Sequence, residues 1–557
     1  MGRMPIGRLQ AVWRLARVIA LTTLASIVCA CGSSTERAEV ATPPSPRAGG
    51  TLRVLHEPIG SLDPVFIDDV YEGNAAQQIF EGLIALDPNL SPKPALAESW
   101  TLSDDGKLYV FRLRSDVRFH DGTPLDAAVA KRSLTLVLRP DKPSACLPET
   151  YFLDIEGAEA YAAGDAREVS GIRVRDPRTL EIQLVKPLSF FLAVLAMGQA
   201  ALTPARLGET WAERQAVPIG TGPFRFVRWE QDGSVLLARN DDYWSVPALL
   251  DSLHFISGAP MTPQRTTAAL FRHQADGASL ASSQARLVEE VGGFRVMSTP
   301  ELSLTFLGIN TKNPPLDRRE VRQALARCVS PAAILESKEN RVVMAQGILP
   351  PGMPGYRPED RRPPYDPVEA RRLLSLAGFP QAAPDRPLRL VTTRMGNRSG
   401  WLREQYIKDL ERIGLEIELE ELDWAELDRV VLNGETDLFN MTWVADVPDP
   451  DAFLYFLFRT GEVNNLVSFS DPMVDSLLAE GRRCPPGPKR FEIYSEIEAR
   501  VLAAMPLVPL YHETAAYAWD PRIEGIEATP FGLAQTTFKR AWFRPERPMR
   551  TYLADLR

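Results

Sequence analysis

The sequence predicts a mixed α/β protein with more than one domain. The chain has 557 residues, whereas a domain has roughly 150 residues on average. Strand-like and helix-like segments alternate along the chain, and no repeat of fixed period occurs, which argues against solenoids and propellers. Its 45% hydrophobic and 24% charged residues are typical of a globular protein.

The N-terminal segment is typical of an export signal. Residues 1–17 contain four arginines and no acid, and the uncharged stretch 18–28 follows them. This stretch is too short for a membrane span, which needs about 20 residues, so residues 1–30 are predicted to be a signal peptide. The letters VCACGSS at 28–34 resemble a lipoprotein processing site, with cleavage after Ala30 and lipid on Cys31. An ordinary secretory peptide is the alternative.

Residues 31–48 are predicted to be a flexible tether, because they are rich in Ser, Thr, Pro and Ala and lack apolar periodicity. The net charge of −9 becomes about −13 when the four arginines of residues 1–30 are removed. A chain this acidic is a poor partner for nucleic acid. The predicted signal peptide and the lipidation site at Cys31 lead us to expect an extracytoplasmic, lipid-anchored protein.

Two hairpins are predicted from alternating apolar residues around Asp-Gly turns. The first covers residues 100–114 and turns at 104–106, and the second has strands at 224–229 and 235–239. Neither hairpin carries chemical groups that indicate a site.

Helix starts are predicted from capping patterns. Thr123 followed by Pro124 predicts an N-cap hydroxyl before a helix that runs toward Leu138. Asp366 followed by a proline predicts a second helix, which Gly378 ends.

Residues 388–444 read as strand, helix, strand, helix and strand, with the second strand at 415–422 and the second helix at about 424–432. This order is typical of a parallel sheet with crossover connections. Ligands of such sheets bind beyond the carboxyl ends of the strands, so the loop after Val444 is a candidate site.

Catalytic and metal-binding patterns are missing from the sequence. It contains no H-E-x-x-H, no G-x-S-x-G, no phosphate-binding loop and no C-x-x-C pair among its five cysteines. Asp449 and Asp451 have the spacing of a carboxylate pair, but such pairs arise by chance among 72 acids, and His120 before Asp121 is read as a turn. We therefore expect no enzyme activity, no metal and no cofactor.

Several ordered segments resemble the bacterial family 5 extracytoplasmic solute-binding proteins, the peptide-binding and oligopeptide-binding components of ABC importers. The resemblance extends from about 49 to 525. Its motifs are GGTLRV (49–54), SLDP (61–64), FEGLIALDP (80–88), PALAESWTLSDDGKLYVFRLRSDVRFHDGTPL (94–125), GTGPFRFVRWEQ (220–231), RNDDYW (239–244), FLGINTKNPPLDRREVRQAL (306–325), LPPGMPGY (349–356), YDPVEARRLLSLAGFP (365–380), WVADVPDPDAFL (443–454) and MPLVPLY (505–511).

The resemblance implies a two-lobed periplasmic-binding-protein fold with an additional domain (the three-domain, cluster C type) that closes on its ligand by a hinge. Domain I would be discontinuous and comprise residues 49–80, 206–300 and 516–557. Domain II would span 81–205 and domain III 301–515.

The resemblance also implies two segments that hydrogen-bond an extended peptide as an added strand. One matches Asp68, Asp69 and Val70, and the other matches Val444 and Ala445 together with the carboxylate that follows them. That carboxylate, Asp446, would pair with the α-amino group of the ligand. A turn or helix N-cap role is the alternative for Asp446.

Two further features are candidates for ligand contacts. Arg394 and Arg398 flank a loop after the first strand of 388–444, where a guanidinium would bind the carboxylate of a short peptide; solvated surface arginines are the alternative. Trp443 and Trp424 are candidates for side-chain pockets or for the core.

The function predicted is a monomeric receptor that captures di- or oligopeptides and delivers them to ABC permease subunits. A nickel chelate, haem, an opine or an oligosaccharide is the alternative solute, and a sensor or a secreted hydrolase are other readings. Cys146, Cys328 and Cys484 remain after processing, which leaves open one disulfide or a buried unpaired Cys328.

Overall fold

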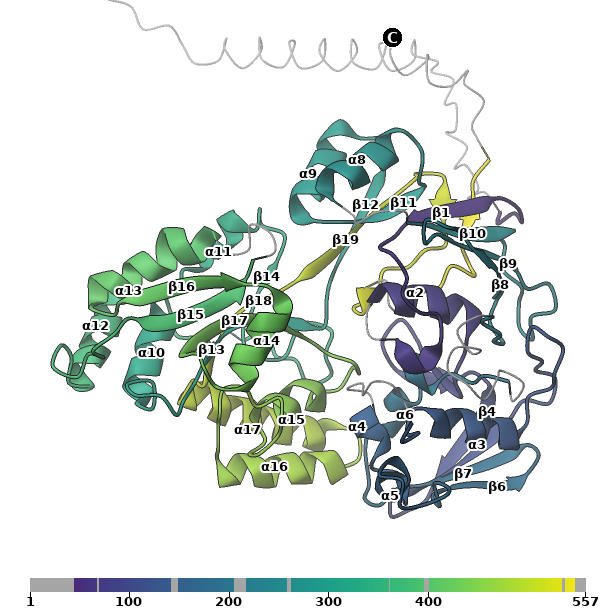
Figure 1. Cartoon of the computed structure of the whole chain (residues 1–557), viewed down its shortest axis with the longest axis horizontal. Helices are drawn as coiled ribbons and strands as arrows, with labels where there is room; N and C mark the ends of the chain where they lie inside the picture. Colours follow the sequence, from purple (N-terminus) through teal and green to yellow (C-terminus); the bar gives the residue numbers. More distant parts are fainter. Residues whose placement is uncertain are drawn as a thin grey trace, which may run out of the picture. The chain divides into compact units, whose positions relative to one another are not determined.

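The structure is a computed structural model that describes residues 45–67, 70–141, 149–204, 217–257, 262–359, 361–394, 400–532 and 536–545 (Figure 1). The predicted signal peptide, Cys31 and all but the last residues of the predicted tether lie outside the described residues. The described chain forms a mixed α/β fold with sheets of seven, six and four strands and two two-stranded sheets. This confirms the predicted fold class.

The seven-stranded sheet combines segments from both ends of the chain. β1 lies inside the sheet and pairs in parallel with β10 and β11, whereas the other pairs are antiparallel. The β8–β9 hairpin has the strand limits predicted from the sequence. In spatial order the strands are β12 (Arg295–Pro300), β19 (Thr514–Trp519), β11 (Gly277–Leu280), β1 (Thr51–Leu55), β10 (Ser252–Ile256), β9 (Val235–Arg239) and β8 (Phe224–Trp229).

The four-stranded sheet is antiparallel throughout and contains the first predicted hairpin, β4–β5. Gly106 adopts a φ of +71° in the turn of this hairpin, a conformation that glycine adopts without the steric penalty of a side chain. The strands are β4 (Ala97–Leu102), β5 (Leu108–Leu113), β7 (Thr179–Gln183) and β6 (Ile172–Asp176), and a small hairpin of β2 (Ile84–Leu86) and β3 (Pro92–Pro94) precedes them.

The six-stranded sheet contains the predicted crossover unit. β15 pairs in parallel with β16 and with β17, so the parallel pattern predicted for residues 388–444 is confirmed. In spatial order the strands are β14 (Val343–Met344), β18 (Leu507–His512), β13 (Ser303–Ile309), β17 (Leu438–Val444), β15 (Leu388–Thr393) and β16 (Ile417–Leu422).

The chain passes from the seven-stranded to the six-stranded sheet between β12 and β13 and returns between β18 and β19 (Figure 1). These two crossing segments bind each other. The amide of Glu301 donates to the carbonyl oxygen of Glu513 over 2.9 Å, and His512 Nδ1 lies 2.7 Å from the carbonyl oxygen of Ser303. Burial lowers the pKa of His512 to about 4, so its imidazole is neutral at pH 7.

Helices cover the sheets, and two of them begin at the residues that the sequence indicated. They are α2 (Val70–Ile79), α3 (Ala127–Leu136), α4 (Glu149–Phe152), α5 (Ala158–Ala162), α6 (Phe191–Val194), α8 (Pro263–Phe271), α9 (Ser282–Val291), α10 (Arg319–Arg327), α11 (Pro331–Ser337), α12 (Pro367–Leu376), α13 (Ile407–Ile413), α14 (Trp424–Leu432), α15 (Asp451–Phe458), α16 (Pro472–Arg483) and α17 (Pro488–Ala504). Among the described residues, none of the helices has the length and apolarity needed to cross a membrane.

One predicted cap is confirmed and one is wrong. Asp366 caps α12 by accepting from the amides of Val368 and Glu369. By contrast, α3 is capped by Asp126, which accepts from the amide of Val129, and not by Thr123. The hydroxyl of Thr123 donates instead to Asp121 over 2.6 Å in the preceding turn, because an aspartate closer to the hydrophobic run offers the better acceptor for the first helical amides.

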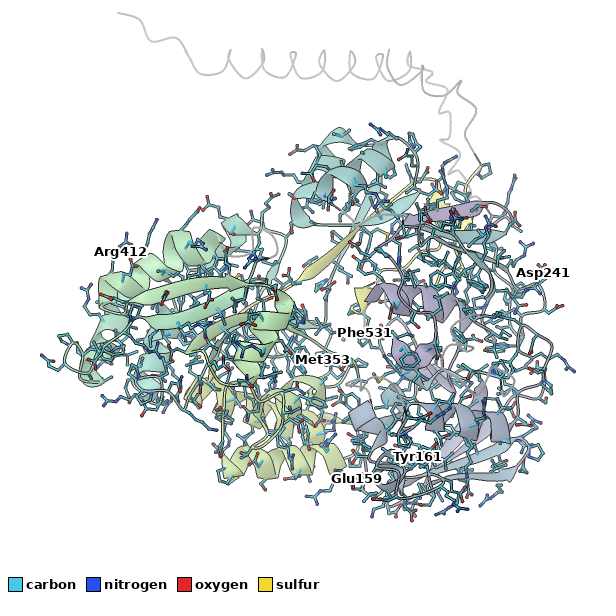
Figure 2. The ribbon with its side chains drawn as sticks, viewed as in Figure 1. Glu159, Tyr161, Asp241, Met353, Arg412 and Phe531 are labelled. Carbon is cyan, nitrogen blue, oxygen red and sulfur yellow. The ribbon has the colours of Figure 1, made fainter. Side chains whose placement is uncertain are left out.

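The largest hydrophobic core cluster contains residues of both the four-stranded and the six-stranded sheets. Figure 2 labels Met353 and Phe531, which are far apart in sequence and both belong to this cluster or pack against it. Cys328 and Cys484 are both free. Burial raises the pKa of the Cys328 thiol to about 12, so Cys328 is the buried unpaired thiol that the sequence left open; Cys146 lies outside the described residues.

Candidate functional site

The carboxyl end of β17 presents unpaired backbone. β17 lies between β13 and β15, and β13 pairs with it along its whole length, from Ile309 opposite Leu438 to Ser303 opposite Val444. β15 pairs only with the first residues of β17, the last pair being Val391 with Phe439. Beyond Phe439, the side of β17 that faces away from β13 therefore has no strand partner in the described part of the chain. Such an edge can accept an extended peptide as an added strand.

Asp446 follows this edge and sits between the buried residues Ala445 and Val447. Burial raises the pKa of its carboxyl to about 6, because the charged form loses hydration. Within the described ranges, no hydrogen-bond donor or cation partners this carboxylate. A cation that reached it would favour the charged form and lower its pKa.

The predicted alternative for Asp446, a turn or cap role, is filled by Asp449. The amide of Asp451 donates to Asp449 Oδ1 over 3.0 Å at the start of α15. The Asp446 carboxylate makes no hydrogen bond in this turn, so it stays available to a ligand.

A cluster of buried ion pairs holds the loop that follows Asp446. We call this cluster the arginine cluster; it consists of Arg482, Arg490, Asp449, Asp451 and Tyr494. Arg490 forms a bidentate pair with Asp449, with both N–O distances at 2.7 Å. Asp451 lies 3.0 Å from Arg482 Nε and accepts a hydrogen bond of 2.9 Å from the Tyr494 hydroxyl. The two carboxylates considered as a catalytic pair are therefore each engaged by an arginine, which is a structural role.

Aromatic side chains join the arginine cluster to the segment around α4. The Tyr151 ring contacts Phe456 of α15 edge to face, with ring centroids 5.4 Å apart, and contacts Phe190 at 5.9 Å. Arg482 lies over the ring of Tyr455 at 4.0 Å and 3.8 Å from Asp154. These contacts bring residues of the 150–190 region next to the loop that carries Asp446.

The structure places the remaining residues of the Asp446 motif as follows. The Trp443 indole N–H donates to the carbonyl oxygen of Ala452 over 2.7 Å, and its ring packs against Phe456, so Trp443 braces α15. Val444 is 52% exposed, and its backbone lies on the open edge. The amide of Ala445 is already engaged, because it donates to the carbonyl oxygen of Leu302.

The predicted carboxylate-binding loop is only partly described. Arg394 is exposed, and its Nη2 donates to the carbonyl oxygen of Glu421 over 3.2 Å, so it lies at the carboxyl end of β16. Trp424, at the start of α14, is 55% exposed. Arg398, Asp68 and Asp69 lie outside the described residues, as does the side chain of Val70, which begins α2.

No group of three or more His, Cys, Asp or Glu side chains in the described ranges is arranged to hold a metal ion. His120 lies in the expected turn, where Nε2 is 3.0 Å from the carbonyl oxygen of Gly222, and burial lowers its pKa to about 4.

Sequence reasoning missed Tyr151, Arg482 and Arg490. The two acids flanked by prolines after β17 were visible in the sequence, and two acids that become buried require cations. Nothing in the spacing of residues far apart in the chain identified which arginines would supply them.

Comparison with known proteins places the chain in one family. A family model for "Bacterial extracellular solute-binding proteins, family 5 Middle" matches residues 91–465. A probable di/tripeptide-binding protein 5 of Pseudomonas aeruginosa is 30% identical over 87% of this chain and 95% of its own length. Heme-binding protein A of Haemophilus influenzae is 27% identical over 92% of this chain and 96% of its own length.

A solved structure shares the fold. The periplasmic binding protein DppA from Helicobacter pylori, in complex with the peptide STSA, superposes with a TM-score of 0.72 at 24% identity and covers 89% of this chain and 98% of its own. The two-lobed periplasmic-binding-protein fold is thus confirmed, and the chain belongs to the family 5 bacterial extracellular solute-binding proteins.

Proposed function

We propose that this protein is a receptor that binds peptides with a free amino terminus and delivers them to the permease subunits of an ABC importer. The observation that carries the proposal is the half-buried carboxylate of Asp446, which has no partner among the described residues, beside the open edge of β17. The edge would bind the peptide backbone without reading its side chains. Asp446 would bind the terminal ammonium through a charge-assisted hydrogen bond.

The relatives support this choice of ligand. One is named a di/tripeptide-binding protein, and the structural neighbour DppA was solved with a bound peptide. Another relative is named for haem, so a non-peptide solute is the alternative. Haem offers carboxylates and no ammonium, and the unpaired negative charge of Asp446 disfavours it.

The location and partners are part of the same proposal. The family acts outside the cytoplasm; we propose further that lipid on Cys31 anchors a monomer to the membrane through the tether of residues 31–48. The three domains 49–80 with 206–300 and 516–557, 81–205, and 301–515 would close on the ligand at the segments that cross between β12 and β13 and between β18 and β19. Arg394 and Arg398 would bind the carboxylate of a short peptide, and Asp68 to Val70 would supply the second backbone contact.

Native mass spectrometry of residues 32–557, as purified and after denaturation, tests the ligand class. A set of small adducts that prove to be peptides is the expected result. A single discrete non-peptide mass would keep the receptor and overturn the peptide assignment.

Titration calorimetry with trialanine and with N-acetyl-trialanine tests the amine contact. We expect tight binding of the free peptide, loss of most of that affinity on acetylation, and the same loss in Asp446→Asn. Asp242→Asn is the matched control, because Asp242 is exposed in the turn after β9 and the change removes the same charge. Equal affinities of Asp446→Asn and the parent chain for trialanine would contradict the proposal.

A further inference from the structure

Four charged side chains connect two parts of the molecule that the chain joins at its two crossing segments. α9 belongs to the part built on the seven-stranded sheet, where it packs in one core cluster with β11 and β19. The turn of residues 338–341 lies between α11 and β14, in the part built on the six-stranded sheet. Arg341 of this turn forms a bidentate ion pair with Glu289 of α9. Glu339 of the turn lies 3.5 Å from Nε of Arg286, also in α9.

We call these two ion pairs the latch; it consists of Arg286, Glu289, Glu339 and Arg341. One member of each pair is largely shielded from solvent, because the side chains of Arg341 and Glu339 are 20% and 25% exposed. A fully exposed ion pair contributes little free energy, whereas partial burial reduces screening by salt. Both pairs join the same two surfaces, so a displacement of one surface from the other would weaken both of them at once.

The backbone of the turn is strained where it supplies these charges. Glu339 and Asn340 adopt φ angles of +53° and +57° directly after α11. Glycine adopts this left-handed conformation at a helix end without a steric penalty, and asparagine tolerates it, but glutamate is uncommon there. A glycine at position 339 would end α11 with less strain. The glutamate side chain therefore indicates a role outside the turn itself.

The turn is also attached to one of the crossing segments. Lys338 Nζ lies 3.6 Å from Glu513 Oε1 and 4.7 Å from the centroid of the Tyr511 ring. Glu513 lies between β18 and β19, where the chain returns to the seven-stranded sheet. A rotation of the two parts at the crossing segments would therefore displace α9 relative to the turn and change both ion pairs.

We propose that the latch stabilises the arrangement in which the two parts are closed on a ligand. In the structure, the ion pairs form together with the contacts between the 150–190 region and the loop that carries Asp446, so all of them belong to one arrangement. Separation of the two parts would break the latch. The latch would therefore slow the release of a ligand that it does not touch. This inference rests on the proposed function, in which the parts close on a peptide.

Charge reversal in the purified chain tests the inference. Arg341→Glu places a carboxylate opposite Glu289 and should lower the affinity for trialanine about threefold to tenfold, with the change in the dissociation rate. It should also increase the radius of gyration of the ligand-free chain in solution scattering, because the closed arrangement becomes less populated. The double variant Arg341→Glu with Glu289→Arg restores the pair with its signs exchanged and should recover both values.

Arg372→Glu is the matched control, because Arg372 pairs with Glu369 within α12 and its reversal repels groups of one part alone. It should change neither the affinity nor the radius of gyration. Glu339→Gly separates the latch from the folding of the turn: it relieves the left-handed backbone, so the melting temperature of the ligand-free chain should stay equal or rise, while the affinity for trialanine falls.

Unchanged trialanine affinity in Arg341→Glu, or a loss that the double variant does not recover, would overturn the inference and leave the proposed function intact. If the parent chain does not bind trialanine, the proposed function fails. The radius of gyration of the ligand-free variants then decides whether the latch holds the two parts together, and an equal radius in Arg341→Glu and the parent chain would overturn it.

Discussion

Asp446 and Asp449 are three positions apart in one loop, but only Asp449 has an ion-pair partner among the described residues. Asp449 accepts hydrogen bonds from both terminal nitrogens of Arg490, each with an N–O distance of 2.7 Å. Asp451 contacts Arg482 and Tyr494. Asp446 is half-buried with no such partner in the described part of the chain, and the loss of hydration raises its pKa to about 6. The arginine cluster therefore fixes the loop, while the Asp446 carboxylate has no cation beside it in the described chain.

Under the proposed function, the loop contains two carboxylates that stabilise the fold and one that would bind the ligand. A buried carboxylate with a partner is expensive to disrupt, because removing the partner leaves an uncompensated charge. A buried carboxylate without a partner weakens the free protein but gains the most when a cationic ligand arrives. Substitutions in the two places should consequently change stability in opposite directions.

The largest effect is expected from Arg490→Met. It leaves Asp449 buried and unpaired, which should lower the free energy of unfolding by about 3–5 kcal/mol, measured by urea denaturation. Arg372→Met is the control, because Arg372 pairs with Glu369 on an exposed face of α12 and should change stability little. Similar losses in both variants would remove the distinction between the arginine cluster and ordinary surface pairs.

Asp446→Asn should act in the opposite direction. The folded pKa of about 6 lies above the ordinary value of 3.8, so the folded protein binds more protons than the unfolded chain between these values, and the Asp446 contribution to stability falls as the pH rises through this window. The variant has no ionisable group at this position, so its free energy of unfolding should be higher than that of the parent chain by up to about 3 kcal/mol at pH 7.5. The gain should vanish near pH 4, and a loss of stability at pH 7.5 would show that Asp446 has a partner after all.

Tyr494→Phe and Tyr151→Phe sharpen the comparison for hydroxyl groups. The first removes a hydrogen bond to Asp451 and one from Arg490 and should cost about 1.5–3 kcal/mol in thermal or urea unfolding. The second removes no hydrogen bond and should cost nothing. Equal destabilisation by both would mean that the Tyr151 hydroxyl is satisfied in solution.

The smallest expected effect is the pH dependence of the affinity for an amine-bearing peptide. Binding requires ionised Asp446, whose pKa of about 6 in the free protein falls once an ammonium is bound. The dissociation constant of trialanine should therefore be lowest near pH 7 and increase about tenfold for each pH unit below 6, as Asp446 takes up a proton. It should increase again above about pH 8, where the α-amino group of the peptide loses its proton. Asp446→Asn should show no such slope, and a flat profile in the parent chain would contradict the amine contact.

Local sequence predicted much of the fold. The β8–β9 hairpin and α14 have the limits that the pattern gave, and the crossover unit of 388–444 was recovered with its parallel pairing. These elements depend on periodicity and turn residues within a short window. The cap of α3 was assigned to Thr123 instead of Asp126, because two capping residues three positions apart compete and only the backbone path selects between them.

The candidate site was predicted in part. The place of Asp446 directly after a strand is confirmed, and its contact with a ligand stays a prediction, whereas Tyr151 and the two arginines of the cluster were not predicted. Their partners lie in distant segments, such as Arg490 with Asp449 and Tyr151 with Phe456, and no local period relates them.

The sequence by itself determined the α/β class, the family resemblance and the position of Asp446 after a strand, because these features depend on neighbouring residues and on motifs in order. Only the tertiary structure decided which carboxylates are paired and which buried hydroxyl groups, such as that of Tyr151, have no hydrogen-bond partner among the described residues. Burial and ion pairing are set by segments that meet after folding, so an aspartate side chain is held in an ion pair or stays unpaired according to whether an arginine lies beside it.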